Sequence, residues 1–217
     1  MTLDKVKIGI IDYGAGNLRS VQKAFEKVGA GAIVSDSAET LGECDGLVLP
    51  GVGAFEEGMR RLREKKLDEF LVANAGRRPL LGICLGLQLL FENSEETFSG
   101  AEKAKGLGLL KGRVVKFKEA GLKVPQVGWN QLEADEDSLL FGGMGRDKWA
   151  YFVHSYYAVP SERGIVAART EYGETKFASA VEDRRQKIFA CQFHPEKSGK
   201  TGLEILGNFA EICGEEK

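Results

Sequence analysis

The first half of the chain alternates short hydrophobic runs with segments in which hydrophobic residues recur every three or four positions. Four short runs predict strands: 6–11, 32–34 (the weakest), 46–49 and 79–83. Between the first two runs, one face of a helix is marked by Leu18, Val21, Phe25 and Val28. The charged segment 55–74 predicts another helix. Such alternation is typical of a parallel sheet wound on both faces by helices.

After residue 91 the pattern changes to successive hydrophobic runs without long helical segments between them. These runs predict strands at 114–117, 128–132, 149–157, 165–170, 177–181 and 188–193. We therefore expect the sheet to acquire antiparallel strands here. A last helix is predicted where one face carries Leu203, Leu206, Phe209, Ala210 and Cys213. Without repeats or linkers, the sequence predicts one α/β domain over residues 1–217, with a mixed, mostly parallel central sheet flanked by helices.

Composition narrows the possible partners and compartment. With 30 basic and 32 acidic residues, the chain has no overall charge that would attract nucleic acid or an anionic membrane. The amino terminus lacks the pattern of a signal peptide, and no hydrophobic run approaches the roughly 20 residues of a membrane span. The four cysteines lie far apart and form no CxxC pair, which disfavours a zinc site or a disulfide framework. We therefore expect a cytoplasmic protein that binds no metal, nucleic acid or membrane.

Cys84 is the central residue of Gly-Ile-Cys-Leu-Gly at 82–86, directly after a predicted strand. This spacing is typical of a nucleophile elbow, because flanking glycines allow a sharp turn and close approach of neighbouring backbone. A following helix containing Leu87, Leu90 and Phe91 would favour the thiolate at its amino terminus. The same residues also fit a buried structural cysteine in a glycine-rich strand end. This segment alone leaves both interpretations open.

A cysteine nucleophile needs a base, usually histidine, and a group that orients the base. The chain has two histidines. His194 follows a hydrophobic strand, and Glu196 comes two residues later, close enough in a tight turn to accept a hydrogen bond from the imidazole. His154 lies inside a predicted strand without a nearby carboxylate, so we expect it to be structural or to line a substrate site. Cys84, His194 and Glu196 are the candidate catalytic residues.

Several segments carry a resemblance to a known family. The elbow, Pro-Gly-Val-Gly at 50–53 and His-Pro-Glu at 194–196 together resemble class I glutamine amidotransferases over almost the entire chain. The resemblance is narrowed to the glutaminase subunits of imidazole glycerol phosphate synthases by IDYGAGNLRS at 11–20, GICLGLQLLF at 82–91, VGWN at 127–130 and FVHSYY at 152–157. One departure is Gln126, where those subunits commonly have histidine. The resemblance implies a flavodoxin-like fold and no cofactor.

The resemblance also implies roles for individual residues. Cys84 would attack the side-chain amide of glutamine, with His194 moving protons and Glu196 orienting it. An oxyanion hole would be formed by the backbone of Gly51, Val52 and Leu85. As a physical switch, we expect rotation of the Gly51–Val52 peptide to complete this hole only in the productive complex with the partner. Glutamine would be held by Gly53, Gln88, Glu96, Ser155 and Tyr156.

A partner is implied as well: a (β/α)8 cyclase subunit that closes the imidazole ring in histidine biosynthesis, with ammonia passing through its barrel in a heterodimer. The interface positions that the resemblance supplies are Trp129, Asn130, Tyr151 and Lys197.

Other functions stay open at this stage. A glutaminase subunit serving pyridoxal phosphate or purine synthesis would share Cys84, His194 and Glu196 and differ in its partner. A free-standing cysteine hydrolase of the same fold would work at full rate alone. A binding module would retain these residues only as scaffold.

Overall fold

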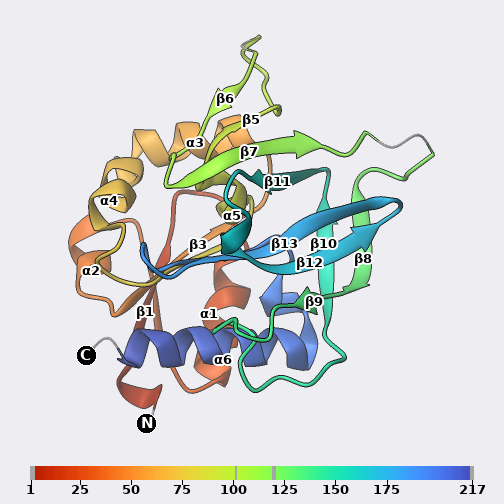
Figure 1. The fold of residues 1–217 in the computed structure, drawn as a ribbon. Helices are drawn as coiled ribbons and strands as arrows, with labels where there is room; N and C mark the ends of the chain where they lie inside the picture. The colour runs from red at the N-terminus through yellow and green to blue at the C-terminus, as the bar shows by residue number, and fades with distance from the viewer. Residues whose placement is uncertain (1–2, 101, 119–120, 216–217) are drawn as a thin grey trace.

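The computed structural model describes residues 3–100, 102–118 and 121–215 (Figure 1). In this part of the chain the central sheet has eight strands. In spatial order they are β2 (Gly31–Ser35), β1 (Lys7–Ile11), β3 (Gly46–Gly51), β4 (Leu80–Cys84), β14 (Ile188–Cys191), β13 (Thr175–Asp183), β12 (Val166–Tyr172) and β9 (Glu133–Ala134). The pairs from β2 to β14 are parallel, and those from β14 to β9 are antiparallel. The prediction of a mixed, mostly parallel sheet is confirmed.

Helices cover both faces of this sheet. They are α1 (Leu18–Lys27), α2 (Ala38–Gly42), α3 (Phe55–Glu64), α4 (Leu67–Asn74), α5 (Leu85–Leu89) and α6 (Gly199–Glu215), with short 3-10 turns η1 (Leu3–Lys5), η2 (Arg163–Ile165) and η3 (Pro195–Lys197). On one face α1 meets α6, where Phe25 and Phe209 pack edge to face. Residues of α2, α3, α4 and α5 build the hydrophobic core of the other face. Every residue of β3 and β4 is buried, as expected of strands covered on both faces.

Two smaller sheets lie beside the central one (Figure 1). The first pairs β8 (Gln126–Gln131) with β10 (Trp149–His154), and the second has the order β11 (Tyr156–Pro160), β7 (Leu110–Lys116), β5 (Phe91–Ser94) and β6 (Ala104–Lys105). We expected the strands after residue 91 to extend the central sheet. That expectation is wrong for β7, β8, β10 and β11. Hydrophobic alternation shows that a strand has a buried face, but it does not show which sheet the strand joins.

Three predicted elements have different bounds. The helix expected over 55–74 is two helices, because Lys66 has a left-handed backbone (φ 55°) that ends one axis and begins another. The strand expected over 149–157 is divided at Ser155, and its halves belong to different sheets. Phe91 is the first residue of β5, so it is not part of the helix after Cys84, which contains only five residues.

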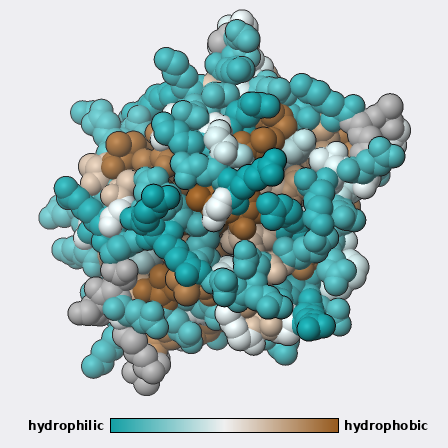
Figure 2. Space-filling model, viewed as in Figure 1, coloured by the Kyte–Doolittle hydropathy of each residue, from teal (hydrophilic) through white to brown (hydrophobic). Residues whose placement is uncertain are grey.

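The surface in the view of Figure 2 is mostly hydrophilic, with hydrophobic areas between charged side chains. Large hydrophobic side chains that are exposed in the described residues include Val127, Trp129 and Trp149, all on β8 and β10. None of the helices in the described ranges has the length and hydrophobicity needed to cross a membrane.

Candidate active site

Cys84 ends β4 in a strained conformation, with φ 53° and ψ −107°. The flanking glycines are sterically required. A Cβ atom on Gly82 would lie 2.9 Å from the backbone nitrogen of Leu87, and one on Gly86 would collide with the carbonyl oxygen of Leu49. Positive φ is uncommon for a residue with a side chain, and such strain is concentrated at functional sites. The predicted elbow is therefore present, and the reading of Cys84 as an ordinary strand-end cysteine is disfavoured.

His194 and Glu196 form a buried pair close to this elbow. The Nδ1 atom of His194 lies 2.9 Å from Oε1 of Glu196, and the two side chains are only 2% and 1% exposed. Pro195 opens η3 between them, and this tight turn brings the carboxylate back to the imidazole. The geometry predicted for these two residues is observed.

The electrostatics of His194 depend on both neighbours. Burial lowers the pKa of the imidazole, but the Cys84 sulfur and the Glu196 carboxylate more than offset this effect and raise the pKa to about 9. The Nε2 atom of His194 has no hydrogen-bond partner in the described part of the chain, which leaves it available to Cys84 or to a substrate. His194 is therefore protonated at neutral pH, and a positively charged imidazolium beside the sulfur is a setting that activates a cysteine nucleophile.

A cavity of about 320 Å³ joins these groups. It is lined by Val52, Gly53, Cys84, Leu85, Gln88, Glu96, Pro125, Val153, His154, Ser155, Tyr156 and His194. All five residues that the resemblance assigned to glutamine binding line it. The cavity lies at the carboxyl ends of β3 and β4, where open α/β sheets commonly bind ligands.

Gln88 belongs to a buried network beside the sulfur. Its Nε2 atom donates to the carbonyl oxygen of Tyr156 (2.9 Å) and to Oε1 of Gln192 (3.1 Å). The Nε2 atom of Gln192 in turn lies 3.7 Å from Sγ of Cys84. Sequence reasoning missed Gln192. A fully buried polar residue in the hydrophobic run 188–193 was the available signal.

Glu96 faces the same cavity but already has a structural contact. Its Oε2 atom accepts a hydrogen bond from the backbone N–H of Phe55 (2.8 Å), at the first residue of α3. Burial raises the pKa of this carboxyl group, although the Phe55 N–H acts in the opposite direction. This hydrogen bond engages one of the two carboxylate oxygens, and the group lines the cavity. Glu96 can therefore anchor α3 and offer an acceptor to a bound cation or ammonium group.

The segment 51–53 is packed beside the nucleophile. Gly51 pairs in register with Cys84 across β3 and β4. A Cβ atom on Gly51 would lie 2.7 Å from the Cβ of Leu85, so only glycine fits there. Val52 is 44% exposed, and Gly53 has φ 110°, a backbone conformation that favours glycine. The N–H of Leu85 is the first of α5 and lacks an intrahelical partner.

His154 lines the cavity without a carboxylate beside it. Its Nδ1 atom lies 2.8 Å from the carbonyl oxygen of Tyr156, and an acceptor there requires the proton to be on Nδ1. Burial lowers the pKa of His154 to about 4, so the ring is neutral at pH 7. A neutral, immobilised imidazole fits the predicted structural or lining role. Gln126 lies opposite His154 in the β8–β10 register and is fully buried.

The four residues expected at an interface differ in their surroundings. Trp129 is 52% exposed and packs edge to face on Tyr151, with ring centroids 6.2 Å apart. Lys197 is exposed one residue after Glu196. Asn130 is already engaged, because its Oδ1 accepts from Gln126 Nε2 (2.9 Å) and its Nδ2 donates to the Glu171 carbonyl (3.3 Å). The exposed Trp129 and the half-buried Tyr151 therefore present an aromatic surface, whereas the side chain of Asn130 is engaged in contacts that hold β8 in place.

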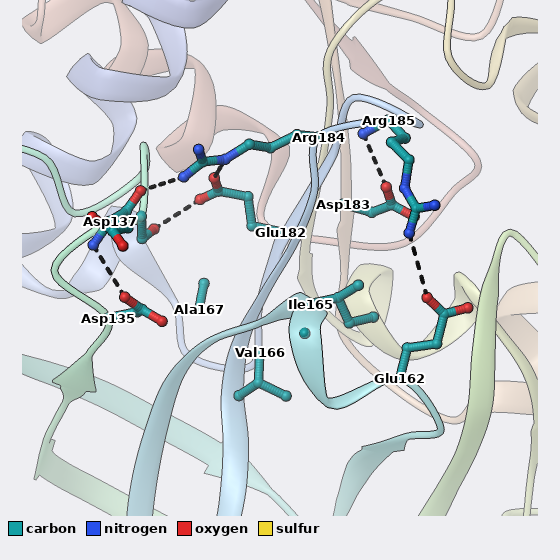
Figure 3. Close-up of a pocket in the computed structure, with 12 residues that line it drawn as sticks. Asp135, Asp137, Glu162, Ile165, Val166, Ala167, Glu182, Asp183, Arg184 and Arg185 are labelled. Carbon is teal, nitrogen blue, oxygen red and sulfur yellow. Dashed lines mark hydrogen bonds and ion pairs between the residues drawn. The ribbon is translucent and has the colours of Figure 1, made fainter.

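A second cavity, of about 370 Å³, lies elsewhere on the sheet, between η2, β12 and the end of β13 (Figure 3). Its charged side chains are engaged with one another: Arg184 bonds Glu182 (2.6 Å), and Arg185 pairs with Glu162 (3.9 Å). Glu182, with a side chain only 5% exposed, also accepts from Ser138 Oγ (2.8 Å). These contacts tie the β13 end to the segment after β9. Within the described ranges, no group of three or more His, Cys, Asp or Glu side chains is placed to hold a metal ion.

Comparison with known proteins shows the family of this chain. The family described as "Glutamine amidotransferase class-I" matches residues 9–213. The imidazole glycerol phosphate synthase subunit HisH of Methanothermobacter thermautotrophicus is 50% identical over 206 residues, covering 94% of this chain and 98% of that protein. The subunit of the same name from Synechococcus elongatus is 48% identical over 207 residues, covering 94% of this chain and 92% of the relative.

Solved structures show the same fold at lower identity. A crystal structure of a glutamine amidotransferase superposes with a TM-score of 0.73 at 22% identity, covering 95% of this chain and 98% of the other. The structure of PurLQS from Thermotoga maritima gives a TM-score of 0.74 at 19% identity, with the same coverage. The chain belongs to the class I glutamine amidotransferases and, within them, to the family of imidazole glycerol phosphate synthase subunits HisH.

Proposed function

We propose that this chain is the glutaminase subunit of an imidazole glycerol phosphate synthase. It hydrolyses glutamine to glutamate and ammonia and delivers the ammonia to a cyclase subunit. The observation that carries the proposal is a strained, cavity-facing Cys84 with the buried His194–Glu196 pair in reach of its sulfur. This is the arrangement of nucleophile, base and orienting group that acyl transfer requires.

In the first half of the reaction the Cys84 sulfur attacks the side-chain amide carbon of glutamine. The C–S bond forms as the carbonyl π electrons move to oxygen, and His194, holding the thiol proton, passes it to the amide nitrogen. The C–N bond breaks and ammonia leaves a γ-glutamyl thioester. In the second half His194 takes a proton from water as the water oxygen attacks the thioester carbon. The C–S bond then breaks, His194 passes its proton to the sulfur, and glutamate departs from the restored thiol.

The surrounding residues support each step. Glu196 holds the imidazole in orientation through Nδ1. The Leu85 N–H and the Val52 N–H supply the oxyanion donors, the second one after the Gly51–Val52 peptide rotates. Gln88, Glu96 and the Ser155–Tyr156 backbone recognise the amino-acid end of the substrate, where Glu96 suits the α-ammonium group. The cavity volume, about 320 Å³, accommodates one amino acid.

The partner we propose is a cyclase subunit with a (β/α)8 barrel, bound as a heterodimer. Ammonia released into water would be protonated and diluted, so a donor subunit needs a covered exit. The aromatic surface formed by the exposed Trp129 and the half-buried Tyr151 lies on β8 and β10, and β10 also carries His154 of the active-site cavity. A partner covering this surface would therefore lie beside the site of ammonia release. Lys197, next to Glu196, adds a charged contact.

The test is steady-state glutamine hydrolysis by the assembled complex, with two histidine variants compared. His194→Asn removes the proposed base, and we expect kcat to fall about 10² to 10⁴-fold. His154→Asn removes a lining residue and should act mostly on KM. Equal losses of kcat would refute the assignment of the base. Full activity of the chain without any partner would favour a free-standing hydrolase.

A further inference from the structure

Tyr13 carries a buried hydroxyl group whose presence the fold does not explain. The residue follows β1 and is only 1% exposed. Its hydroxyl makes no hydrogen bond with any residue in the described part of the chain. A buried polar group without a partner destabilises the folded state, and phenylalanine would fill the same space without this cost. We therefore expect the Tyr13 hydroxyl to form a hydrogen bond in another conformation of the protein.

The hydroxyl lies directly against the segment that we assign to the oxyanion hole. A Cβ atom on Gly51 would be 2.5 Å from the Tyr13 oxygen. The turn after Tyr13 packs on the same segment, since a Cβ on Gly16 would lie 3.3 Å from the Cβ of Pro50. Arg61 holds this turn by donating a hydrogen bond to the carbonyl oxygen of Gly14. The hydroxyl is therefore fixed in position beside Gly51.

Strand order places the two polar groups on either side of β3. In the central sheet β1 is one neighbour of β3 and β4 is the other. Tyr13 follows β1, whereas Cys84 ends β4 and pairs with Gly51. The end of β3 thus runs between a phenol and the nucleophile. Burial, together with the nearby Cys84, raises the pKa of Tyr13, so at neutral pH the phenol is protonated and can donate.

A peptide is planar and trans, so its N–H and C=O point in opposite directions. A rotation of the Gly51–Val52 peptide that turns the Val52 N–H toward the oxyanion also turns the Gly51 carbonyl away from Cys84. Gly51, as a glycine, tolerates a wide range of backbone angles, and Val52 is 44% exposed, so packing restrains its side chain only in part. The displaced carbonyl oxygen then needs a donor, because buried carbonyls are seldom left unpaired.

We propose that Tyr13 is a positioning residue for the glutaminase reaction: its hydroxyl donates a hydrogen bond to the Gly51 carbonyl in the rotated peptide and so stabilises the completed oxyanion hole. This inference rests on the function proposed above. In the resting chain the donor is unpaired. When the peptide rotates, donor and acceptor pair, which shifts the population toward the active conformation.

The experiment compares wild type with Tyr13→Phe in the complex with the cyclase subunit of the same organism. We expect kcat for glutamine hydrolysis to fall about tenfold or more, as for loss of support to one oxyanion donor, with KM changed less than about twofold. The melting temperature of the variant should be equal or higher, because an unpaired buried group has been removed. Alkylation of Cys84 by iodoacetamide forms no oxyanion, so its rate should be unchanged.

Tyr172→Phe is the matched control. The hydroxyl of Tyr172 already donates to the carbonyl oxygen of Lys123 (2.5 Å), so its removal should lower the melting temperature and leave kcat unchanged. Three results with Tyr13→Phe would each overturn the inference: an unchanged kcat, a fall in both kcat and melting temperature, or slower alkylation of Cys84. A wild-type complex that hydrolyses no glutamine would overturn the proposed function, and this inference with it.

Discussion

At the scale of single residues, the four cysteines of this chain are all buried and form no disulfide in the described structure, yet only Cys84 lines the active-site cavity. Cys84 faces a cavity that it shares with His194. Cys191, by contrast, has no exposed surface, and burial raises the pKa of its thiol well above the ordinary value. Both residues are buried, so burial does not distinguish them. Cys84 differs from Cys191 because it has access to a cavity and lies beside the charged His194.

Cys84→Ser should reduce glutamine hydrolysis at least about 10³-fold, because a hydroxyl is a far weaker nucleophile than the thiolate in this geometry. The loss should appear in kcat of the assembled complex, while partner affinity is unchanged. Cys191→Ala is the control, and we expect it to cost stability but retain activity within about twofold. Activity that survives in Cys84→Ser and disappears in Cys191→Ala would contradict the assignment of the nucleophile.

His154 should make the stability of the fold depend on pH. Its pKa is about 4 in the folded chain, below the ordinary value of 6.5, because burial disfavours the charged ring. The unfolded state therefore binds more protons between these values. The neutral His154 ring therefore contributes roughly 3 kcal/mol to the free energy of unfolding. This contribution is complete above pH 6.5 and is lost as the pH falls through about 4. Urea unfolding of wild type and His154→Gln at pH 4 to 8 measures this. Parallel curves for the two proteins would show that His154 does not titrate as described.

At the scale of elements, the contact between α5 and β3 decides the geometry of the elbow. Gly86 lies in α5, and its Cα faces the backbone of Leu49 in β3 so closely that no side chain fits. The glycine thus sets how near the five-residue helix can come to the strand, and with it the position of Cys84. Gly207, in the long helix α6, has open space around it instead.

Gly86→Ala should therefore destabilise the protein by about 3 kcal/mol, the upper range for forcing an extra carbon into packed structure. Gly207→Ala, the matched substitution, should raise stability by about 0.5–1 kcal/mol, because alanine is the better helix former. Thermal unfolding of both variants gives the comparison. Similar changes in the two melting temperatures would mean that the α5–β3 contact is looser than described.

At the scale of the whole molecule, the active-site cavity and the exposed aromatic surface share β10, which connects the proposed chemistry to the proposed partner. Alternate residues of this strand face opposite ways, so His154 is buried beside the cavity while Tyr151 contacts Trp129 on the outside. A partner that packs on the aromatic surface would press on the strand that lines the site. We therefore expect slow hydrolysis by the isolated chain and strong stimulation by the cyclase subunit, with a further increase when its nucleotide substrate is bound.

Trp129→Ala should weaken association with the cyclase at least about tenfold and reduce stimulation in parallel, without changing the slow turnover of the isolated chain. Val72→Ala is a suitable control, since Val72 is 50% exposed but lies on α4. Affinity from titration calorimetry and glutaminase rates at increasing cyclase concentration provide the measurement. If the Trp129→Ala variant binds the cyclase with wild-type affinity, the interface does not include this part of β8.

The sequence by itself determined the main fold and singled out the candidate catalytic residues. The elbow motif, the His-Pro-Glu turn and the strand–helix alternation are local patterns whose physical causes act within a few residues. Glycine is needed where neighbouring backbone comes close, and a tight turn brings the carboxylate back to the imidazole. Hydrophobic residues recur with the period of the helix or strand because one face of the element is covered. Only the tertiary structure decided which strands left the central sheet, that Gln192 lies beside Cys84, and that the hydroxyl of Tyr13 rests on Gly51. These contacts join segments that are far apart in the chain. Hydrophobic alternation indicates that a residue is buried, but it does not indicate which other residues it packs against.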